Sequence, residues 1–353
     1  MTSAHTLTSE DISRWRNLPT ESCTFFQTYS WNQFLTEAYS YPDYTITVET
    51  EDESNAFLPL KLVKSQLFGN RLISTPFSDH AGPTETELGN QTLLLQTALE
   101  KHNRLKTDFL EVRLSRNLSS NLYHALDQLG FKQVHEYRSF IMDLTNGDKA
   151  TWKMISQSTR RAIKKSQQEG IEVREAKSAA DIQSYHQLHL ASSREHGSPA
   201  HSLKFFTKMY TNLNPEGKMK LLIATHNQCD VAGLLLLRHR PTVHYWQSAL
   251  PSKYRTLNPF HELLWKALTN SIEEGFTGFD MGRTRSGTGV SRFKRTWGGM
   301  EYQLDHYCFF AGKTPKLADP EDLKYKAASA VWKRIPQTIL SRVDSHIIRE
   351  IAL

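Results

Sequence analysis

The stretch 279–299 reads FDMGRTRSGTGVSRFKRTWGG and follows a long helical pattern that ends at Gly275. It predicts a strand, a glycine-spaced loop, a short helix over 289–296 and a glycine turn into another strand. Glycine lets the backbone of such a loop approach a ligand closely. The loop also gathers five cations, namely Arg283, Arg285, Arg292, Lys294 and Arg295. This crowding favours an anionic partner: a phosphate, a carboxylate or a developing oxyanion.

A solvated basic loop would carry the same charges, so the aromatic residues decide between the two interpretations. Phe293 and Trp297 stand four positions apart among the cations. Side chains at that spacing share one face of a helix, which would anchor the short helix to a core. We therefore expect a loop that is held in place. Its glycine spacing and its basic residues do not fit a dinucleotide-binding fingerprint.

Composition places the chain among globular proteins with two domains. Of its 353 residues, 39% are apolar and 23% are charged, and the net charge of +6 moderately favours anionic partners. Cys23, Cys229 and Cys308 are scattered, which predicts neither a disulfide framework nor a metal site and fits a reducing cytoplasm. We see no signal peptide, and no apolar run approaches the roughly 18 residues of a membrane span. The expected location is the cytoplasm, at the inner face of the membrane if the tail described below binds lipid.

Alternating helix and strand patterns predict an α/β fold. A first helix contains Trp31 and Phe34 and is capped by Thr28 or Ser30. Further helices are expected over 87–104, 118–129, 148–169, 179–195, 203–213 and 259–274. Strands are expected over 44–50, 56–64, 108–114, 131–136, 137–144, 171–176, 219–225, 231–238, 243–250, 278–281 and 302–310.

One order of elements occurs twice: a helix, a strand, a second helix, a glycine turn and strand sequence. The first instance begins at residue 87 and the second at residue 259. This repetition suggests two copies of one α/β unit of about 150 residues. We assign 1–147 to the first domain, 148–312 to the second, which starts with a basic joining helix, and 313–353 to a helical tail broken at Pro336.

Several short motifs are shared with one known family. They are Leu67-Phe68-Gly69, Thr75-Pro76-Phe77, RRAIKK at 160–165, REHGSP at 194–199, YRTLNP at 254–259, and Phe293-Lys294. Together they resemble the Fem-type peptidyl transferases, a branch of the GNAT acyltransferase superfamily, over residues 22–310. The resemblance implies two GNAT-like domains in tandem, each a mixed central sheet flanked by helices, followed here by the C-terminal helical tail.

The same resemblance implies a reaction. Fem-type enzymes transfer an aminoacyl group from charged tRNA to an amine of a peptidoglycan precursor by direct attack. No tightly bound cofactor takes part; the charged tRNA is the donor substrate. Lys294 matches the lysine of the family's Phe-Lys pair, which is proposed to steady the anionic oxygen during transfer. Arg194 and Tyr254 occupy positions at which the family contacts substrate phosphates.

Two departures from the family pattern affect the choice of donor and acceptor. The long coiled-coil insertion of the Fem members that extend staphylococcal-type bridges is absent. The GNAT pyrophosphate loop is replaced by YRTLNP, in which no glycine opens the backbone. This weakens acyl-CoA as the donor, although Arg255 and the following helix start suit a phosphate. Two alternatives stay open: an acyl-CoA-dependent N-acetyltransferase of envelope or exopolysaccharide synthesis, and a non-catalytic module that binds tRNA or envelope precursor.

Amine acylation needs a general base and a group that holds the oxyanion. The candidate bases are Asp79, His80, Asp280 and His261; Asp280 ends a strand beside the glycine loop, where it would alternatively pair with Arg283 or Arg285. With Lys294 these give the predicted catalytic set Lys294, Asp280, Asp79 and His80. The predicted substrate-binding residues are Arg194, Tyr245, Tyr254, Arg255, Asn258, Arg283, Arg285, Arg292 and Phe293.

The tail carries Ile335, Ile339, Val343, Ile347 and Ile351 at helical spacing, with basic residues nearby. Such a helix suits either peripheral contact with a membrane that bears a lipid-linked substrate, or packing on its own domain or a partner subunit.

Overall fold

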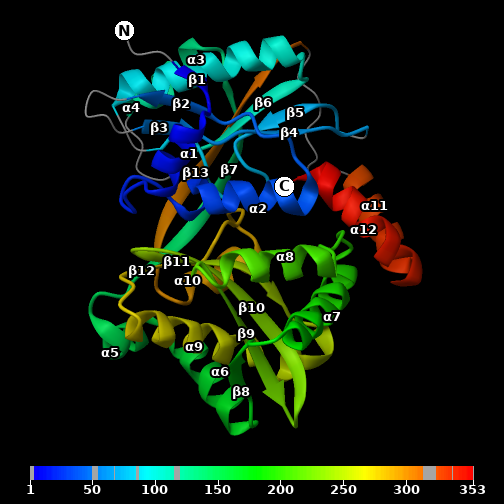
Figure 1. The fold of residues 1–353 in the computed structure, drawn as a ribbon. Coiled ribbons are helices and arrows are strands. Elements are labelled where there is room, and N and C mark those ends of the chain that lie inside the picture. The colour runs from blue at the N-terminus through cyan, green and yellow to red at the C-terminus, as the bar shows by residue number, and fades with distance from the viewer. Residues whose placement is uncertain are drawn as a thin grey trace. The chain divides into compact units, whose positions relative to one another are not determined.

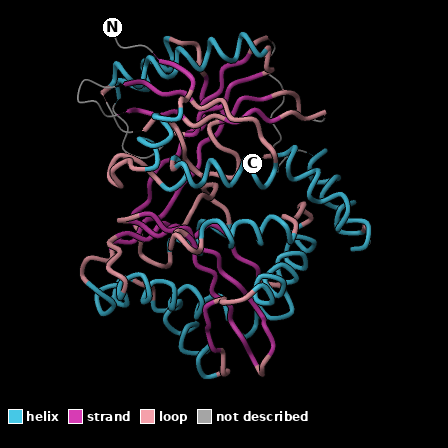
Figure 2. Tube along the Cα trace, in the orientation of Figure 1, coloured by secondary structure: helices cyan, strands magenta, loops and turns pink. Residues whose placement is uncertain are grey.

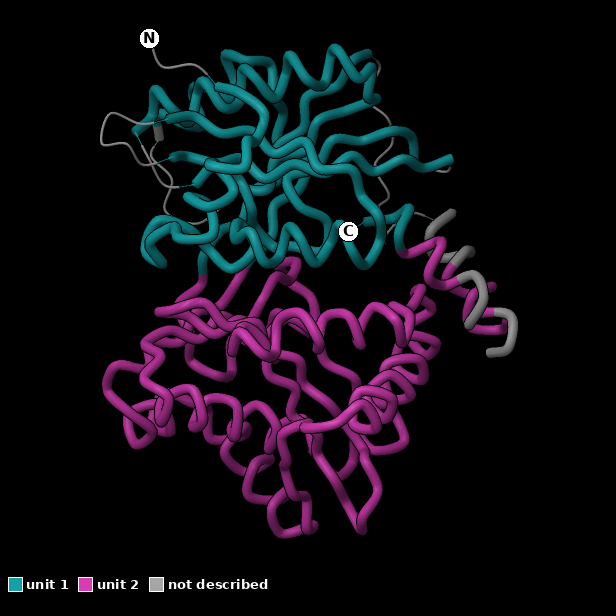
Figure 3. The backbone as a smooth tube through the Cα atoms, viewed as in Figure 1, with its two compact units in different colours: residues 1–138, 302–315, 349–353 teal, residues 139–301, 316–348 magenta. Residues whose placement is uncertain are grey.

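The computed structural model describes residues 4–49, 55–66, 68–84, 87–114, 120–312, 323–335 and 337–352 (Figure 1; Figure 2). Leu67 of the first motif, residues 118–119 of one predicted helix and residues 313–322 of the tail lie outside these ranges. The chain forms two compact units (Figure 3). Unit 1 comprises 1–138, 302–315 and 349–353, and unit 2 comprises 139–301 and 316–348.

Unit 1 is built on a mixed sheet with the strand order β4-β5-β6-β13. These strands span Lys61–Val63, Arg71–Ile73, Phe109–Arg113 and Met300–Phe310. Strands β5 and β6 are parallel, whereas β6 and β13 are antiparallel. A small antiparallel sheet adds β1 (Ala4–Thr6), β2 (Ile46–Glu49) and β3 (Asn55–Leu58). The helices are α1 (Ser9–Arg16), α2 (Tyr29–Tyr39), α3 (Leu88–Leu105) and α4 (Ser120–Gln128), with a 3-10 turn at Phe25–Gln27.

Unit 2 contains the strand order β7-β12-β11-β10-β9-β8, in which only β11 and β12 run parallel. The strands are β7 (Lys132–Asp143), β8 (Glu172–Glu175), β9 (Met219–His226), β10 (Cys229–His239), β11 (Thr242–Ala249) and β12 (Gly278–Asp280). The helices are α5 (Gly147–Met154), α6 (Gln157–Gln168), α7 (Ala179–His196), α8 (Leu203–Leu213), α9 (Pro259–Glu273) and α10 (Gly289–Arg295). A 3-10 turn, η2 (Ser252–Leu257), precedes α9.

Helices cover both faces of the unit 2 sheet. Leu234 and Leu236 of β10 share a buried core with Leu263 and Leu264 of α9. Gly233 points the other way, because successive residues of a strand face opposite sides. A Cβ at Gly233 would lie 2.4 Å from the Tyr185 ring of α7, so the glycine makes room for that helix.

The predicted repeat is present, and its last strands are exchanged. The order α3-β6-α4-β7 recurs as α9-β12-α10-β13. However, β7 of the first copy pairs with β12 of the second, and β13 of the second copy pairs with β6 of the first. The compact units therefore differ from the predicted ranges. The first division falls inside β7, between residues 138 and 139, and residues 302–312 group with unit 1 because β13 pairs there.

Four predicted elements need correction. The single helix over 148–169 is two helices, because Ser156 caps α6 by accepting the Thr159 N–H and its own N–H bonds to Thr296 O at 2.8 Å. The strands predicted over 131–136 and 137–144 are one continuous strand, β7. The strand over 56–64 is interrupted between Leu58 and Lys61 and forms parts of two sheets.

Gly298, in the turn from α10 to β13, is required by its backbone and its neighbour. Its φ is +83° and a Cβ there would meet the Met154 carbonyl oxygen at 2.5 Å. We expect Gly298→Ala to lower the free energy of unfolding by about 2–4 kcal/mol, from left-handed strain plus the overlap. Urea unfolding measures it. The matched control is Gly217→Ala (φ +64°, open space around the Cβ), which should cost about 1–2 kcal/mol for strain alone. An equal loss of unfolding free energy in the two variants would contradict a contribution from the overlap with the Met154 carbonyl oxygen.

The tail forms α11 (Leu323–Arg334) and α12 (Gln337–Ile351), so the predicted break around Pro336 is confirmed, although that residue itself is not described. Helix α11 packs on α7, where the Ser329 hydroxyl donates to His196 O at 3.2 Å. The tail thus packs on its own chain. Of the predicted apolar stripe, the side chains of Ile339 and Val343 are not described. No described helix combines the length and hydropathy needed to span a bilayer.

Asp344 of α12 makes the tail sensitive to pH. It is buried and accepts hydrogen bonds from the Ala200 N–H and the Trp332 indole, but burial dominates and raises the pKa of its carboxyl to about 6. A carboxyl whose folded-state pKa is raised binds a proton more tightly in the folded state, so stability falls as pH rises from about 4 to about 6. Hydrogen exchange of the α12 amides should therefore quicken over that range, beyond the intrinsic effect of pH. Asp344→Asn should remove this component, and an unchanged profile in the variant would contradict the assignment.

Candidate functional site

The unit 2 sheet opens where β12 ends. Strand β11 pairs with β12 only through Thr242–His244 opposite Gly278–Asp280. Beyond His244, β11 continues to Ala249 in register with β10, after a bulge opposite Leu235 and Leu236. The carboxyl end of β12 and the following loop therefore lie beside the second half of β11. In open α/β sheets, ligands bind at the carboxyl ends of parallel strands.

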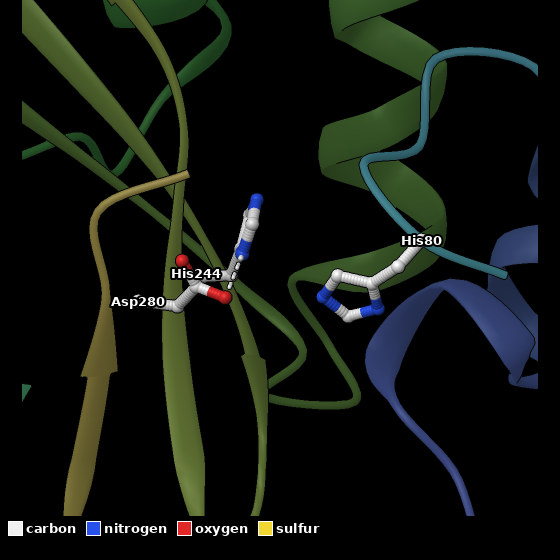
Figure 4. Close-up of side chains that lie close together, drawn as sticks. All are labelled: His80, His244 and Asp280. Atoms are coloured by element: carbon white, nitrogen blue, oxygen red, sulfur yellow. Dashed lines mark ion pairs between the residues drawn. The ribbon is translucent and has the colours of Figure 1, made fainter. Parts of the chain in front are cut away.

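Asp280 and His244 meet at this opening (Figure 4). Asp280 is 1% exposed and His244 is 4% exposed. The carboxylate Oδ2 lies 3.4 Å from His244 Nδ1, and Figure 4 shows the two side chains turned toward each other. Oδ1 accepts the Gly282 N–H at 2.8 Å and the hydroxyl of Ser139 from β7. The Gly282 N–H and the Ser139 hydroxyl thus fix the carboxylate that orients His244.

This arrangement suits proton transfer. A carboxylate at Nδ1 favours the imidazole tautomer that has its proton on Nδ1 and its lone pair on Nε2. Such a ring accepts a proton through Nε2, and the buried carboxylate stabilises the imidazolium that forms. Asp280 was predicted as a base from its place at a strand end; the structure adds that it pairs with His244. The pair can therefore act as a base in which Nε2 of the buried His244 takes the proton.

Lys294 of α10 is buried beside the same turn. Its Nζ donates to Gly282 O at 2.7 Å and to Arg283 O at 3.0 Å, and it lies 5.5 Å from the centre of the Tyr245 ring. Gly282 thus receives Lys294 on its carbonyl while its N–H binds Asp280. Lys294 holds the glycine turn that shapes the carboxylate's surroundings. This contact differs from the predicted one with a substrate oxygen, which remains a prediction.

The basic loop is anchored as its aromatic residues predicted. Phe293 packs on Phe260 with ring centres 5.8 Å apart and on His261 at 5.4 Å, while Trp297 is fully buried. Burial lowers the pKa of His261, and its ring packs between Phe293 and Trp297, which favours the packing role over the base. The loop's cations are more exposed: Arg292 is exposed and donates to Gly287 O at 2.8 Å, and Arg283 and Arg285 are half-buried.

A cavity of about 340 Å³ lies near the second half of β11. It is lined by His189, Ser192, Ser193, His196 and Ser198 of α7 and its following loop, by Gln247, Ser248 and Leu250, and by Arg255 and Phe260. Burial lowers the pKa of His189 to about 3, so this imidazole is neutral. Ser248 also contacts the Tyr245 hydroxyl at 2.7 Å, and burial raises the pKa of Tyr245 to about 12.

The start of α9, beside this cavity, offers few donors to a ligand. Asn258 takes a left-handed conformation (φ 54°), and Pro259 at the first helical position has no N–H. The His261 N–H is bonded to Asn258 O at 3.0 Å. Glu262 adds an acid to the first turn. Phosphates bind helix starts through exposed N–H groups and the positive end of the dipole, and here both contributions are reduced.

The other predicted site residues divide between the units. Arg194 is exposed at the end of α7, Arg255 is exposed at the cavity, and Tyr254 is half-buried with Lys253 Nζ 4.6 Å from its ring centre. Asp79 and His80 belong to unit 1. The Asp79 carbonyl is 3.3 Å from His306 Nε2, and His80, also labelled in Figure 4, is buried edge-on to Phe26.

Sequence reasoning missed the residues that the fold alone brings in. His244 and Ser139 reach Asp280 through strand register, and the serines of α7 reach Gln247 through helix packing. The sequence placed His244 only in the predicted strand 243–250 and gave it no role in the site.

Residues 155–295 match the model of the acetyltransferase (GNAT) domain. The crystal structure of FemX shares the fold with a TM-score of 0.66 at 14% identity, over 86% of this chain and 96% of that chain. The structure of L-PGS from Bacillus licheniformis has a TM-score of 0.54 at 14% identity, over 87% of this chain and 96% of that chain. A tandem GNAT protein from the clavulanic acid biosynthesis pathway has a TM-score of 0.59 at 10% identity, over 89% of this chain and 100% of that chain. None of the curated proteins matches the sequence.

The fold is therefore α/β with two GNAT-like domains in tandem, and the match to FemX confirms the expected likeness to Fem-type proteins at the level of fold. The chain carries a GNAT-type acyltransferase domain, which contains the pair of Asp280 and His244 and Lys294.

Proposed function

We propose that the protein transfers an aminoacyl group from charged tRNA to an amine of a peptidoglycan or other cell-envelope precursor. The observation that carries the chemistry is the buried pair of His244 and Asp280 at the sheet opening, within the acyltransferase domain. Acylation of an amine requires removal of a proton, and the pair supplies a base for it. FemX and L-PGS, whose fold the chain shares, support an envelope-related acceptor.

The proposed reaction is a direct transfer. The acceptor nitrogen attacks the carbonyl carbon of the aminoacyl ester, its surplus proton passes to His244 Nε2, and an amide bond forms. The ester carbon–oxygen bond then breaks, and the terminal tRNA hydroxyl leaves with a proton returned by the imidazolium. Asp280 acts as the positioning residue that keeps the imidazole in its productive tautomer. Lys294 shapes the site through the Gly282 turn and contributes positive potential where the oxyanion develops.

Two observations support tRNA as the donor. The start of α9 has few available N–H groups and carries Glu262, which disfavours a pyrophosphate there. Helix α6 presents Arg161, Lys164 and Lys165 to solvent, whereas Arg160 is bonded to the Trp152 and Lys153 carbonyls. Exposed cations along one helix suit a polyanionic backbone.

A labelled-donor assay tests this proposal. Envelope precursors that bear a free amine are incubated with the protein and either tRNA charged with radiolabelled amino acids or radiolabelled acetyl-CoA. We expect label to move from tRNA to the precursor. Transfer from acetyl-CoA alone would replace the proposal with the N-acetyltransferase, which the GNAT match and the clavulanic acid pathway relative favour. Transfer from neither donor, with retained tRNA binding, would favour the non-catalytic binding module.

The role of α6 is tested by removing its exposed charges. The triple variant Arg161→Gln, Lys164→Gln, Lys165→Gln should weaken tRNA binding and reduce the slope of log K against log salt by about two, because each neutralised phosphate contributes about 0.7–0.9. The matched control removes three exposed cations of unit 1, Lys64, Arg104 and Lys132. Its slope should stay within about 0.5 of the wild-type slope. Equal losses for both triples would mean that binding follows net charge alone.

A further inference from the structure

Two arginines of unit 1 are buried on neighbouring parallel strands, four positions apart in the register. Arg71 of β5 is 6% exposed and Arg113 of β6 is 1% exposed. Arg113 donates from Nε to Glu111 Oε1 at 2.7 Å and from Nη1 to Ser78 O at 2.9 Å. Burial alone would raise the pKa of Glu111, but Arg113 and His306 outweigh it and hold that pKa well below its usual range. The strands themselves thus supply one carboxylate for two guanidinium groups.

The other hydrogen bonds of the two guanidinium groups go to the segment 349–352 at the end of α12. Arg71 donates to Ile351 O at 2.9 Å and to Glu350 O, and Arg113 donates to Ala352 O at 3.1 Å. The Tyr41 hydroxyl donates to Arg349 O at 2.6 Å. Four consecutive main-chain carbonyl oxygens are therefore held. The site recognises oxygen atoms in a row, with little dependence on the side chains that carry them.

The charge balance of this cluster depends on the segment. Glu350 contributes the second carboxylate: its Oε2 accepts the Ser65 hydroxyl at 2.9 Å, and its charge acts favourably on Arg71. Burial lowers the pKa of Arg71, which shows that keeping it charged there is costly. Neutral carbonyls offset the desolvation of a guanidinium less well than an anion does, because an anion adds the attraction between two full charges. If the segment left, two buried cations would face Glu111 alone.

The backbone next to Arg113 is strained in the manner of a ligand clamp. Thr75 and Phe77 have φ values of 54° and 59°, in the left-handed region that β-branched and bulky residues avoid, and both are buried. Ser78 follows directly, and its carbonyl receives Arg113. Strain of this kind persists where the surrounding structure holds it and concentrates at ligand clamps and switch regions.

We propose that Arg71 and Arg113 form a phosphate-binding site in unit 1, and that segment 349–352 is an internal ligand that exchanges with the phosphate. The carbonyl oxygens and Glu350 occupy the positions that phosphate oxygens take when the segment is released. Binding of a phosphorylated ligand and docking of the segment are then mutually exclusive. The site lies in unit 1 and is independent of the proposed acyl transfer.

Calorimetric titration with inorganic phosphate tests this exchange in the full chain and in a chain that ends after Ile348. The shortened chain should bind phosphate at least tenfold more tightly, and Arg71→Met in the shortened chain should abolish that gain. The peptide SHIIREIA, residues 345–352, should compete with phosphate for the shortened chain. Acetate titrated in place of phosphate should show no comparable gain; an equal gain with acetate would indicate a carboxylate site and overturn the assignment to phosphate.

Equal phosphate affinity in both chains would overturn the proposal, as would a gain that survives Arg71→Met. If the shortened chain does not fold, the full-length Glu350→Gln variant decides, since it weakens the internal ligand by one charge. It should bind phosphate severalfold more tightly than the wild type, and an unchanged affinity would again overturn the exchange.

Discussion

Asp280→Asn should lower the turnover number by about 10³- to 10⁴-fold while leaving the fold in place. Asparagine keeps the shape of the side chain and its acceptor for the Gly282 N–H and the Ser139 hydroxyl. Its amide group, turned toward His244, donates where the carboxylate accepted. The imidazole then places its proton on Nε2 and cannot take one from the acceptor amine. The loss follows from the tautomer and requires no change in structure.

Steady-state transfer assays measure this loss, and urea unfolding checks that the variant is folded. Asp143→Asn is the control, because Asp143 is an exposed carboxylate of β7 that bonds only locally, to Thr145. The double variant of Asp280→Asn with His244→Gln should lose little more than either single variant, as expected for residues that act as one unit. General-base catalysis typically contributes about 10²- to 10⁴-fold to a rate. A turnover number for Asp280→Asn within about threefold of the wild-type value would therefore refute the role of the pair.

Lys294→Met should lower the free energy of unfolding by about 3–6 kcal/mol and also reduce turnover. Two carbonyl oxygens, those of Gly282 and Arg283, lose a charged donor, and bonds to charged groups contribute about 1.5–3 kcal/mol each. The Gly282 N–H binds Asp280, so a looser turn also loosens the pair. We expect turnover to fall more than tenfold while affinity for the donor is kept, because the lysine acts on the chemical step.

Arg292→Met is the matched control for Lys294→Met. It removes a cation from the same short helix, but Arg292 is exposed and donates to a single carbonyl, that of Gly287. Its cost should stay below about 1 kcal/mol. If Lys294→Met and Arg292→Met lower the free energy of unfolding equally, Lys294 stabilises the protein through the general charge of the loop. Its bonds to the Gly282 and Arg283 carbonyls would then make no separate contribution.

Local patterns were sufficient to predict most elements and one half of the site. The glycine spacing and the pair Phe293 and Trp297 predicted an anchored loop, and the repeated order of elements predicted two related units. The end of a strand beside that loop marked Asp280. These inferences succeed because helix faces, turns and strand ends depend on residues close together in the chain.

The other site residues and the unit boundaries could not be predicted, because they depend on strand register and on pairing between distant parts of the chain. His244 reaches Asp280 because β11 and β12 pair in one parallel register, and Ser139 arrives on a third strand. Strands β7 and β13 are exchanged between the repeats, so the unit boundaries differ from the predicted ones. The exchange could not be predicted, because the residues of a strand do not specify its partner strand. The contact of Arg71 with the end of α12 joins residues 280 positions apart.

The most direct measurement of the central claim is binding of the purified protein to charged tRNA and to acetyl-CoA, each across a salt series. The account predicts micromolar tRNA binding that weakens steeply with salt and little response to acetyl-CoA, because the cations of α6 meet a polyanion while the start of α9 offers few phosphate donors. Saturable acetyl-CoA binding together with only feeble tRNA binding would contradict it.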